Sequence, residues 1–252
     1  MLDAQYILGC RLDLIDADEA AAQIMHLVAN GEGAQIVTLG TEMVVHARRD
    51  EAFRAVVNAS ALSLCDTVGL LYVARRRGST LRERVTGIGL IERLCDLAAR
   101  TGVPVYFLGG AAGVAADAAA VLEARFPGLR VAGTHDGYFT EDRNDEVVEA
   151  IRSSGARLLF AGLGSPRQEL WLAGHLSATG CGAAIGVGGS LDVFAGRVER
   201  APQAFQRLGL EWLYRLIREP RRWRRQLALP KFVGLVTLER LGLLQKNGLV
   251  RS

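Results

Sequence analysis

The sequence predicts an α/β fold with a doubly wound, mainly parallel sheet and a C-terminal α-helical appendage. Short apolar runs alternate with longer amphipathic segments of helical period, which is the rhythm of repeated strand–helix–strand units. Most of the short runs are apolar on both faces, as expected for strands covered by helices on both sides. The 29 glycines against 6 prolines favour many tight turns between strands and helices.

Six strands and seven helices are predicted before residue 188, and their order is that of a Rossmann-like domain. The predicted strands are Gln35–Leu39, Ala61–Cys65, Val103–Leu108, Leu129–Gly133, Leu158–Gly162 and Ala183–Val187. The predicted helices are Ala17–Ala29, Glu42–Asn58, Val68–Arg77, Ile88–Arg100, Val114–Arg125, Asp142–Ser153 and Arg167–Ala178.

The pattern then changes, and amphipathic stretches without another strand run from Pro202 to Leu244. The segment from Arg197 to Arg225 holds nine arginines and three glutamates, a charge of +6, whereas the rest of the chain sums to −3. Tryptophan and tyrosine side chains are interleaved with these arginines. This composition is typical of segments that bind an anionic membrane surface or a diphosphate. We therefore expect an α/β domain at residues 1–196 and a membrane-associating helical appendage at residues 197–252, docked at least in part on the domain.

Several chemistries are excluded by residue usage. Arginine supplies 28 of the 30 basic residues, and Lys231 and Lys246 lie in neither a P-loop nor a Tyr-x-x-x-Lys motif. The four cysteines and four histidines show no metal-ligand spacing, and Asp16-Ala17-Asp18 is explained as a helix cap. We expect neither a metal site nor a cofactor. The chain has no apolar run of about 18 residues and no basic N-terminal leader, so we expect a cytoplasmic protein that does not span the membrane.

Candidate site residues follow the predicted strands, because ligands of open parallel sheets bind at the carboxyl ends of strands. Asp66 directly follows an apolar strand, where its carboxylate could act as a general base or simply cap the helix that starts near Thr67. Arg167, Gln168 and Glu169 open a helix after another strand. They could touch a ligand, or Glu169 could complement the helix dipole while Arg167 is solvated.

A glycine-rich turn that includes Gly109, Gly110 and Gly113 follows a third strand and opens a helix, so it could hold a phosphate. It is not a full G-x-G-x-x-G, because Leu108 occupies the position of the first glycine. Asp136 lies downstream at a suitable distance for a ribose contact. The alternative is a tight turn without a ligand.

The appendage carries an arginine face. Arg215, Arg218, Arg222 and Arg225 are spaced three, four and three residues apart, which aligns them on one side of a continuous helix. The guanidinium groups of such a face suit phosphate oxygens, although a solvated helix face is the ordinary alternative.

Taken together, these residues resemble the WecG/TagA/CpsF family of bacterial glycosyltransferases, glycosyltransferase family 26. The resemblance covers nearly the whole chain and is most specific from Gly186 to Arg225. It is supported by the stretch GLGSPRQELW at Gly162–Trp171 and by RVTG at Arg84–Gly87.

The resemblance implies inverting transfer of a sugar from a UDP-sugar to a polyprenyl-diphosphate-linked saccharide in cell-surface polysaccharide biosynthesis. The donor sugar would be of the N-acetylmannosamine type, its uronic acid, or a hexose such as glucose. Asp66 matches the proposed catalytic base. Thr38 and Gln168 match substrate-site residues, and Arg215, Arg222 and Arg225 match arginines of an appendage that closes the site and brings the enzyme to the inner face of the membrane.

The sequence departs from the family pattern at two positions beside the expected sugar site. The usual T-x-N-x-E reads Thr38-Leu39-Gly40-Thr41-Glu42, and the usual Asp-Gly reads Asp66-Thr67. These departures leave the donor sugar open.

Two other functions compete with this interpretation. The glycine turn and Asp136 support the interpretation as a dinucleotide-dependent oxidoreductase. The sequence lacks the catalytic Tyr/Lys pair of such enzymes. The arginines of the C-terminal segment support the interpretation as a nucleic-acid-binding module. The net negative charge of the rest of the chain argues against it. We expect no nucleic-acid partner, and the oligomeric state stays open.

Overall fold

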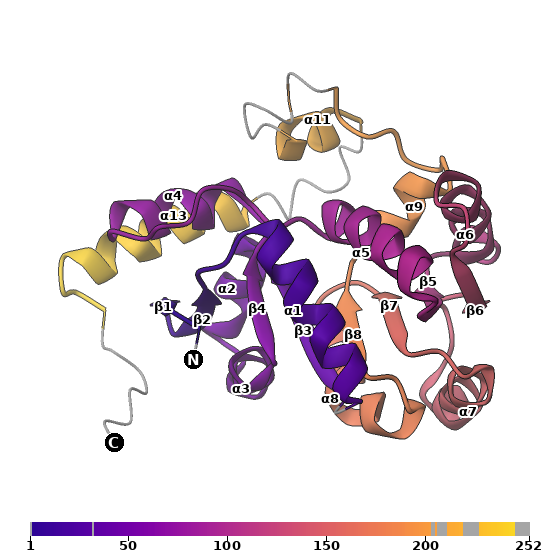
Figure 1. Ribbon diagram of the computed structural model, residues 1–252. Coiled ribbons are helices and arrows are strands. Elements are labelled where there is room, and N and C mark those ends of the chain that lie inside the picture. The colour runs from indigo at the N-terminus through magenta and orange to yellow at the C-terminus, as the bar shows by residue number, and fades with distance from the viewer. Residues whose placement is uncertain (1, 32, 203–204, 206–210, 219–226, 245–252) are drawn as a thin grey trace.

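The computed structural model describes residues 2–31, 33–202, 205, 211–218 and 227–244. Its centre is a six-stranded, all-parallel sheet with the strand order β4-β3-β8-β7-β5-β6 (Figure 1). The strands are β3 (Ala34–Leu39), β4 (Leu62–Cys65), β5 (Pro104–Gly109), β6 (Arg130–His135), β7 (Leu158–Gly162) and β8 (Ala183–Gly186). All six predicted strands and the doubly wound α/β class are confirmed.

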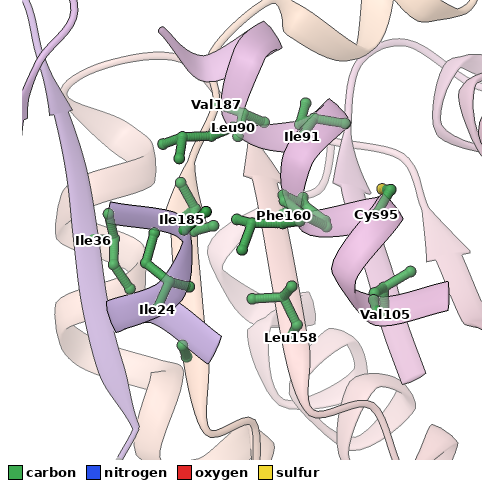
Figure 2. Packing of buried hydrophobic residues seen from close by; sticks show 14 of the residues in the cluster. Ile24, Ile36, Leu90, Ile91, Cys95, Val105, Leu158, Phe160, Ile185 and Val187 are labelled. Atoms are coloured by element: carbon green, nitrogen blue, oxygen red, sulfur yellow. The ribbon is translucent and has the colours of Figure 1, made fainter. Parts of the chain in front are cut away.

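Helices cover both faces of this sheet, because alternate strand residues point to opposite sides and both sets are apolar. On one face, Ile36, Phe107 and Phe160 pack against α1 (Ala17–Asn30), α5 (Gly87–Thr101) and α6 (Val114–Arg125). Figure 2 shows part of this cluster, with Phe160 among side chains of the neighbouring strands and of α5.

The opposite face carries two further clusters. The first holds residues of β3, α2 (Thr41–Ala47), α3 (Glu51–Ala59) and α4 (Val68–Arg76). The second holds residues of β5, β7, α7 (Asn144–Ser154) and α8 (Arg167–Thr179), and a short 3-10 helix at Glu141–Arg143 precedes α7.

Two predicted details are wrong. The single helix expected at Glu42–Asn58 is divided into α2 and α3, because the Asp50 side chain accepts the Phe53 N–H at 2.9 Å and starts a second helix. No helix is predicted between Val187 and Pro202, and the short helix α9 (Ser190–Phe194) lies there. Asp16 caps α1 in a capping box with Glu19, as expected for Asp16-Ala17-Asp18.

The described part of residues 197–252 includes the helices α11 (Glu211–Arg218) and α13 (Ala228–Arg240). Helix α13 packs on α2, and Phe232 is only 1% exposed within the cluster of α2, α3 and α4. The segment is therefore docked on the α/β domain through α13. None of the described helices combines the length and the hydropathy needed to cross a membrane.

A hairpin that sequence reasoning missed covers the edge strand β4. It consists of β1 (Ala4–Ile7) and β2 (Cys10–Asp13), each only four residues long. The Asp13 carboxylate accepts the backbone N–H of Ser63 on β4 at 2.7 Å and an N–H of Arg11 at 3.1 Å. Because β4 has no further strand beyond it, the Asp13 side chain supplies the acceptor that a neighbouring strand would supply.

Replacement of Asp13 tests this contact. Asp13→Ala should lower the free energy of unfolding by about 1–3 kcal/mol, since the buried Ser63 N–H loses its acceptor. Asp13→Asn keeps an acceptor oxygen and should cost less. Urea unfolding of the three proteins measures the difference, and an Asp13→Ala variant as stable as the original chain would contradict the assignment.

Candidate active site

The polar turns predicted from the sequence meet along one edge of the sheet. From the middle of the sheet, the chain passes outward from β3 to β4 on one side and from β5 to β6 on the other, while β7 and β8 fill the centre. Such a reversal of direction opens a crevice outside the carboxyl ends of the central strands. The strand ends divide into one set on β4, β3 and β8 and another on β7, β5 and β6.

Asp66 stands at the carboxyl end of β4. Its backbone N–H donates to Leu39 O at 3.0 Å, which fixes it beside the end of β3. The N-cap of α4 is Thr67, not Asp66, and the Thr67 hydroxyl accepts the Thr41 N–H at 3.3 Å. The structure thus places the carboxylate at the sheet edge and gives the capping position to the next residue.

Thr38 and Gln168 lie on the two sides of β8. The Thr38 hydroxyl donates to Gly186 O at 2.8 Å, and the Gln168 side-chain oxygen accepts the Gly188 N–H at 3.0 Å. Both side chains are therefore tied to the turn after β8. Asp66 after β4 and Thr38 near the end of β3 are at neighbouring strand ends, and Gln168 reaches the end of β8 from α8. We call these three residues the strand-end row.

Glu169 is a buried carboxyl group behind this row. It is 1% exposed, and its Oε1 accepts the side-chain N–H of Gln168 at 2.7 Å. Because the Gly188 N–H can only donate, it sets which end of the Gln168 amide is oxygen, and the amide nitrogen then faces Glu169. Sequence reasoning considered Glu169 only as a helix-dipole partner or a ligand contact and missed this positioning of Gln168.

Burial raises the pKa of Glu169, and hydrogen bonds from Gln168 and Ser165 offset part of the rise. Gly186 leaves the space for this pair, because a β-carbon there would lie 2.6 Å from the amide nitrogen of Gln168. The stretch GLGSPRQELW was the sequence signal for this part of the site, although burial of its glutamate could not be inferred from it.

The two departures from the family pattern contact each other. A β-carbon built on Gly40 would lie 3.4 Å from the Thr67 methyl group, which is van der Waals contact. A larger side chain at position 40 would have to extend past that methyl group. Gly40 and Thr67 are therefore coupled in space next to Asp66.

The glycine turn and Asp136 are brought together on the other half of the sheet edge. The Gly137 N–H donates to Gly110 O at 2.8 Å, and Asp136 accepts the Tyr138 N–H at 3.0 Å. Gly109 has a φ of 143°, and a β-carbon there would lie 2.5 Å from Gly162 O, so the packing of the turn already requires glycine. Gly113 is the N-cap of α6, with a φ of 83°.

Arg167 stabilises the same turn. Its guanidinium donates to Gly137 O at 2.6 Å and Phe139 O at 2.7 Å, and it lies 4.7 Å from the centre of the Phe139 ring. Arg167 is exposed, as the solvated alternative expected, but its guanidinium is also held by these two carbonyls. Its hydrogen bonds connect the start of α8 to the Asp136 turn.

The arginine face is only partly described. Arg215 lies on α11, but its side chain is outside the described part of the chain, as are Arg222 and Arg225 entirely. Arg218 pairs with Glu199, and the Tyr214 hydroxyl donates to the same carboxylate at 3.1 Å. These contacts connect α11 to the segment that follows α9.

Other reactive side chains contribute little to this edge. Burial raises the pKa of the Cys10, Cys65 and Cys95 thiols to about 12, which keeps them protonated near neutral pH. Within the described ranges, no three His, Cys, Asp or Glu side chains converge as candidate metal ligands.

The Glu169 environment predicts a specific pH dependence. A carboxyl group whose pKa is raised on folding stabilises the fold below its unfolded pKa, and this stabilisation is lost as pH rises through the folded pKa. Glu169→Gln stays neutral and can still accept from Gln168. The free energy of unfolding of the original chain should therefore fall relative to that of Glu169→Gln as the pH rises from the ordinary glutamate pKa, about 4.3, through the raised pKa of the folded state.

Glu146→Gln is the matched control. The Arg143 guanidinium lowers the pKa of Glu146, so the original chain should gain stability relative to this variant as pH rises. Urea unfolding across the pH series measures both differences. If the free energies of unfolding of the original chain and of Glu169→Gln change with pH in parallel, the raised pKa of Glu169 is contradicted.

The chain is similar in sequence to known glycosyltransferases. The model of the glycosyl transferase WecG/TagA/CpsF family matches residues 5–246. The chain is 36% identical over 230 residues to an N-acetylglucosaminyldiphosphoundecaprenol N-acetyl-beta-D-mannosaminyltransferase of Bacillus spizizenii, covering 90% of this chain and 88% of that protein.

The match extends from the hairpin, through both halves of the sheet edge, to the residues beyond α13. It gives no support to the dinucleotide-dependent oxidoreductase considered from the glycine turn. The chain belongs to the WecG/TagA/CpsF family and is a glycosyltransferase of cell-surface polysaccharide biosynthesis.

Proposed function

We propose that the chain transfers a sugar, with inversion, from a UDP-sugar to a saccharide linked to polyprenyl diphosphate. The strongest support is its 36% identity, over nearly its full length, to a transferase named for adding N-acetylmannosamine to such an acceptor. An N-acetylmannosamine-type donor is therefore favoured, with its uronic acid or a hexose such as glucose as alternatives allowed by Gly40 and Thr67.

Asp66 acts as the general base in this proposal. Its carboxylate takes the proton from the acceptor hydroxyl, whose oxygen then forms the new bond to the anomeric carbon of the donor. The bond from that carbon to the diphosphate oxygen breaks, and UDP leaves with the bonding electrons. The position of Asp66 directly after β4, at the carboxyl edge of the sheet, supports this role.

Donor binding extends across the sheet edge. Thr38 of β3 and Gln168 of α8 orient the substrates, and Glu169 holds the Gln168 amide. The glycine turn with Gly109, Gly110 and Gly113 binds the UDP phosphates, and Asp136 binds the ribose. The closeness of that turn to Asp136 supports the assignment.

The arginines of residues 197–252 stabilise the diphosphates and attract the enzyme to the inner face of the membrane. Arg215, Arg222 and Arg225 are assigned to this role, since planar guanidinium groups match phosphate oxygens. Each basic residue near an anionic bilayer contributes about 1 kcal/mol, so several together are sufficient for reversible binding.

The first functional prediction separates the two strand-end aspartates. Asp66→Asn should lower the rate of transfer by about 10²–10⁴-fold while UDP affinity stays near normal, because only acceptor activation is lost. Asp136→Asn is the matched variant and should weaken UDP binding. Mass measurement of the product from UDP-N-acetylmannosamine and a lipid-diphosphate-N-acetylglucosamine acceptor, with calorimetric titration of UDP, tests both. Normal turnover of Asp66→Asn would remove Asp66 from the mechanism.

The second functional prediction concerns the contact between Gly40 and Thr67. Gly40→Asn alone should impair transfer, because the new side chain meets the Thr67 methyl group. Adding Thr67→Gly should relieve this contact and raise the preference for UDP-N-acetylmannosamine over UDP-glucose.

A double-mutant cycle on kcat/KM for both donors measures the interaction between these positions. We expect a coupling of about 0.5–3 kcal/mol, the range for residues in contact. Simple additivity of the two substitutions would show that the contact does not select the donor.

A further inference from the structure

A cavity of about 870 Å³ lies between α4, α13 and the β1–β2 hairpin. Its size is within the range of about 300–1,000 Å³ that is usual for small-molecule sites. Figure 1 shows α4 and α13 on the same side of the molecule, next to this hairpin. The sequence analysis assigned no role to these surfaces.

The floor of the cavity is apolar. Leu8, Val73, Phe232 and Val236 line it, and Phe232 and Leu8 are buried beneath it. Tyr72 and Val233, which also line it, are 59% and 57% exposed. Tyr72 and Val233 are thus open to water beside a buried apolar floor, as in a site that receives an apolar body.

Three helices begin together at one end of the cavity. A β-carbon built on Gly69 would lie 2.8 Å from the methyl group of Thr41 at the start of α2 and 3.6 Å from Leu229 near the start of α13. At the other end, Arg77 pairs with Glu239. Helices α4 and α13 are therefore parallel, and the C-terminal ends of α2, α4 and α13 lie away from Gly69.

Those C-terminal ends carry the charge. Arg48 follows α2, Arg76 ends α4 and Arg240 ends α13, and all three line the cavity. Among the described residues none of the three has a carboxylate partner; Arg76 donates instead to the Tyr72 hydroxyl at 3.1 Å. Arg54, also in the lining, is paired with Glu51.

Cations at helix C-termini complement the helix dipoles, which by itself accounts for one arginine per helix. It does not account for an apolar cavity beside three guanidinium groups that have no carboxylate partner in the described ranges. Such a combination is complementary to an amphipathic anion, with an apolar body along the floor and a charged head at the arginine end.

We propose that this cavity binds a lipid with a phosphate head group, whose phosphate contacts Arg48, Arg76 and Arg240 and whose chain lies over Val73, Phe232 and Val236. Inorganic phosphate alone would leave Tyr72 and Val233 exposed to water, and an uncharged chain would leave the guanidinium groups unmatched. The lipid can be a polyprenyl phosphate or a bilayer phospholipid. This site goes beyond the proposed sugar transfer and does not depend on it.

Calorimetric titration of the full chain with soluble probes tests the proposal. The probes are farnesyl phosphate, dihexanoyl phosphatidylglycerol, farnesol and inorganic phosphate. At least one of the two phosphate-bearing lipids should bind, with farnesol and inorganic phosphate at least about tenfold weaker. A preference for farnesyl phosphate assigns the site to polyprenyl lipids, and a preference for phosphatidylglycerol assigns it to the bilayer.

Matched variants locate the binding. Arg76→Gln combined with Arg240→Gln should weaken lipid binding at least about tenfold, whereas Arg100→Gln combined with Arg130→Gln removes the same charge elsewhere and should leave it unchanged. Val233→Glu places a negative charge at the exposed mouth and should also weaken binding. Thermal unfolding of each variant checks that the fold is retained.

Three outcomes would overturn the proposal: no binding of either phosphate-bearing lipid, unchanged binding by the Arg76/Arg240 variant, or equal affinity for farnesol. The titrations contain no sugar donor, so they are independent of transfer. Asp66→Asn should bind the lipid normally even where it fails to transfer sugar. Loss of one property can therefore be told from loss of the other.

Discussion

Parallel pairing of β3 with both β4 and β8 is the constraint on which the rest of the molecule depends. Parallel strands need a crossover between them, so all six strands of this sheet end at the same edge and each is followed by a turn into a helix. The turns that carry Asp66, Thr38 and Gln168 are neighbours only because their strands are. Apolar residues on both faces of each strand keep this register.

The active-site edge combines two electrostatic environments. Glu169 lies in an apolar interior that disfavours its charge, and it serves Gln168 as a hydrogen-bond acceptor. Asp66 is half-buried directly after β4. Of the two carboxyl groups, Glu169 holds an amide, and Asp66 accepts a proton in the proposed mechanism.

The C-terminal segment connects this edge with the outer surface of the domain. Phe232 of α13 packs in the same cluster as the residues of α2 and α4, which begin next to Gly40 and Asp66. This packing joins the strand-end row to the cavity between α4 and α13. In the two proposals, the end of the cavity at Gly69 lies near Asp66, and the arginine end lies farther from the reacting groups.

Local sequence by itself determined the six strands, the α/β class and the positions of Asp66, Thr38 and Gln168. Buried parallel strands are apolar on both faces, and the residue after such a strand lies at the binding edge wherever the strand falls in the sheet. The sugar-transfer reaction came from the resemblance to a family. The same residues are compatible with that reaction, but they do not identify the donor sugar.

Only the tertiary structure decided the features that depend on distant contacts. The β1–β2 hairpin is stabilised by Asp13 against Ser63, fifty residues away, which no local pattern reveals. The break at Asp50 is a capping bond within an otherwise helical pattern. Burial of Glu169, the hydrogen bonds of Arg167 to the Asp136 turn, and the cavity at Arg48, Arg76 and Arg240 all require segments that meet only after folding. Periodicity reports which face of an element is apolar, whereas these contacts depend on which elements then pack together.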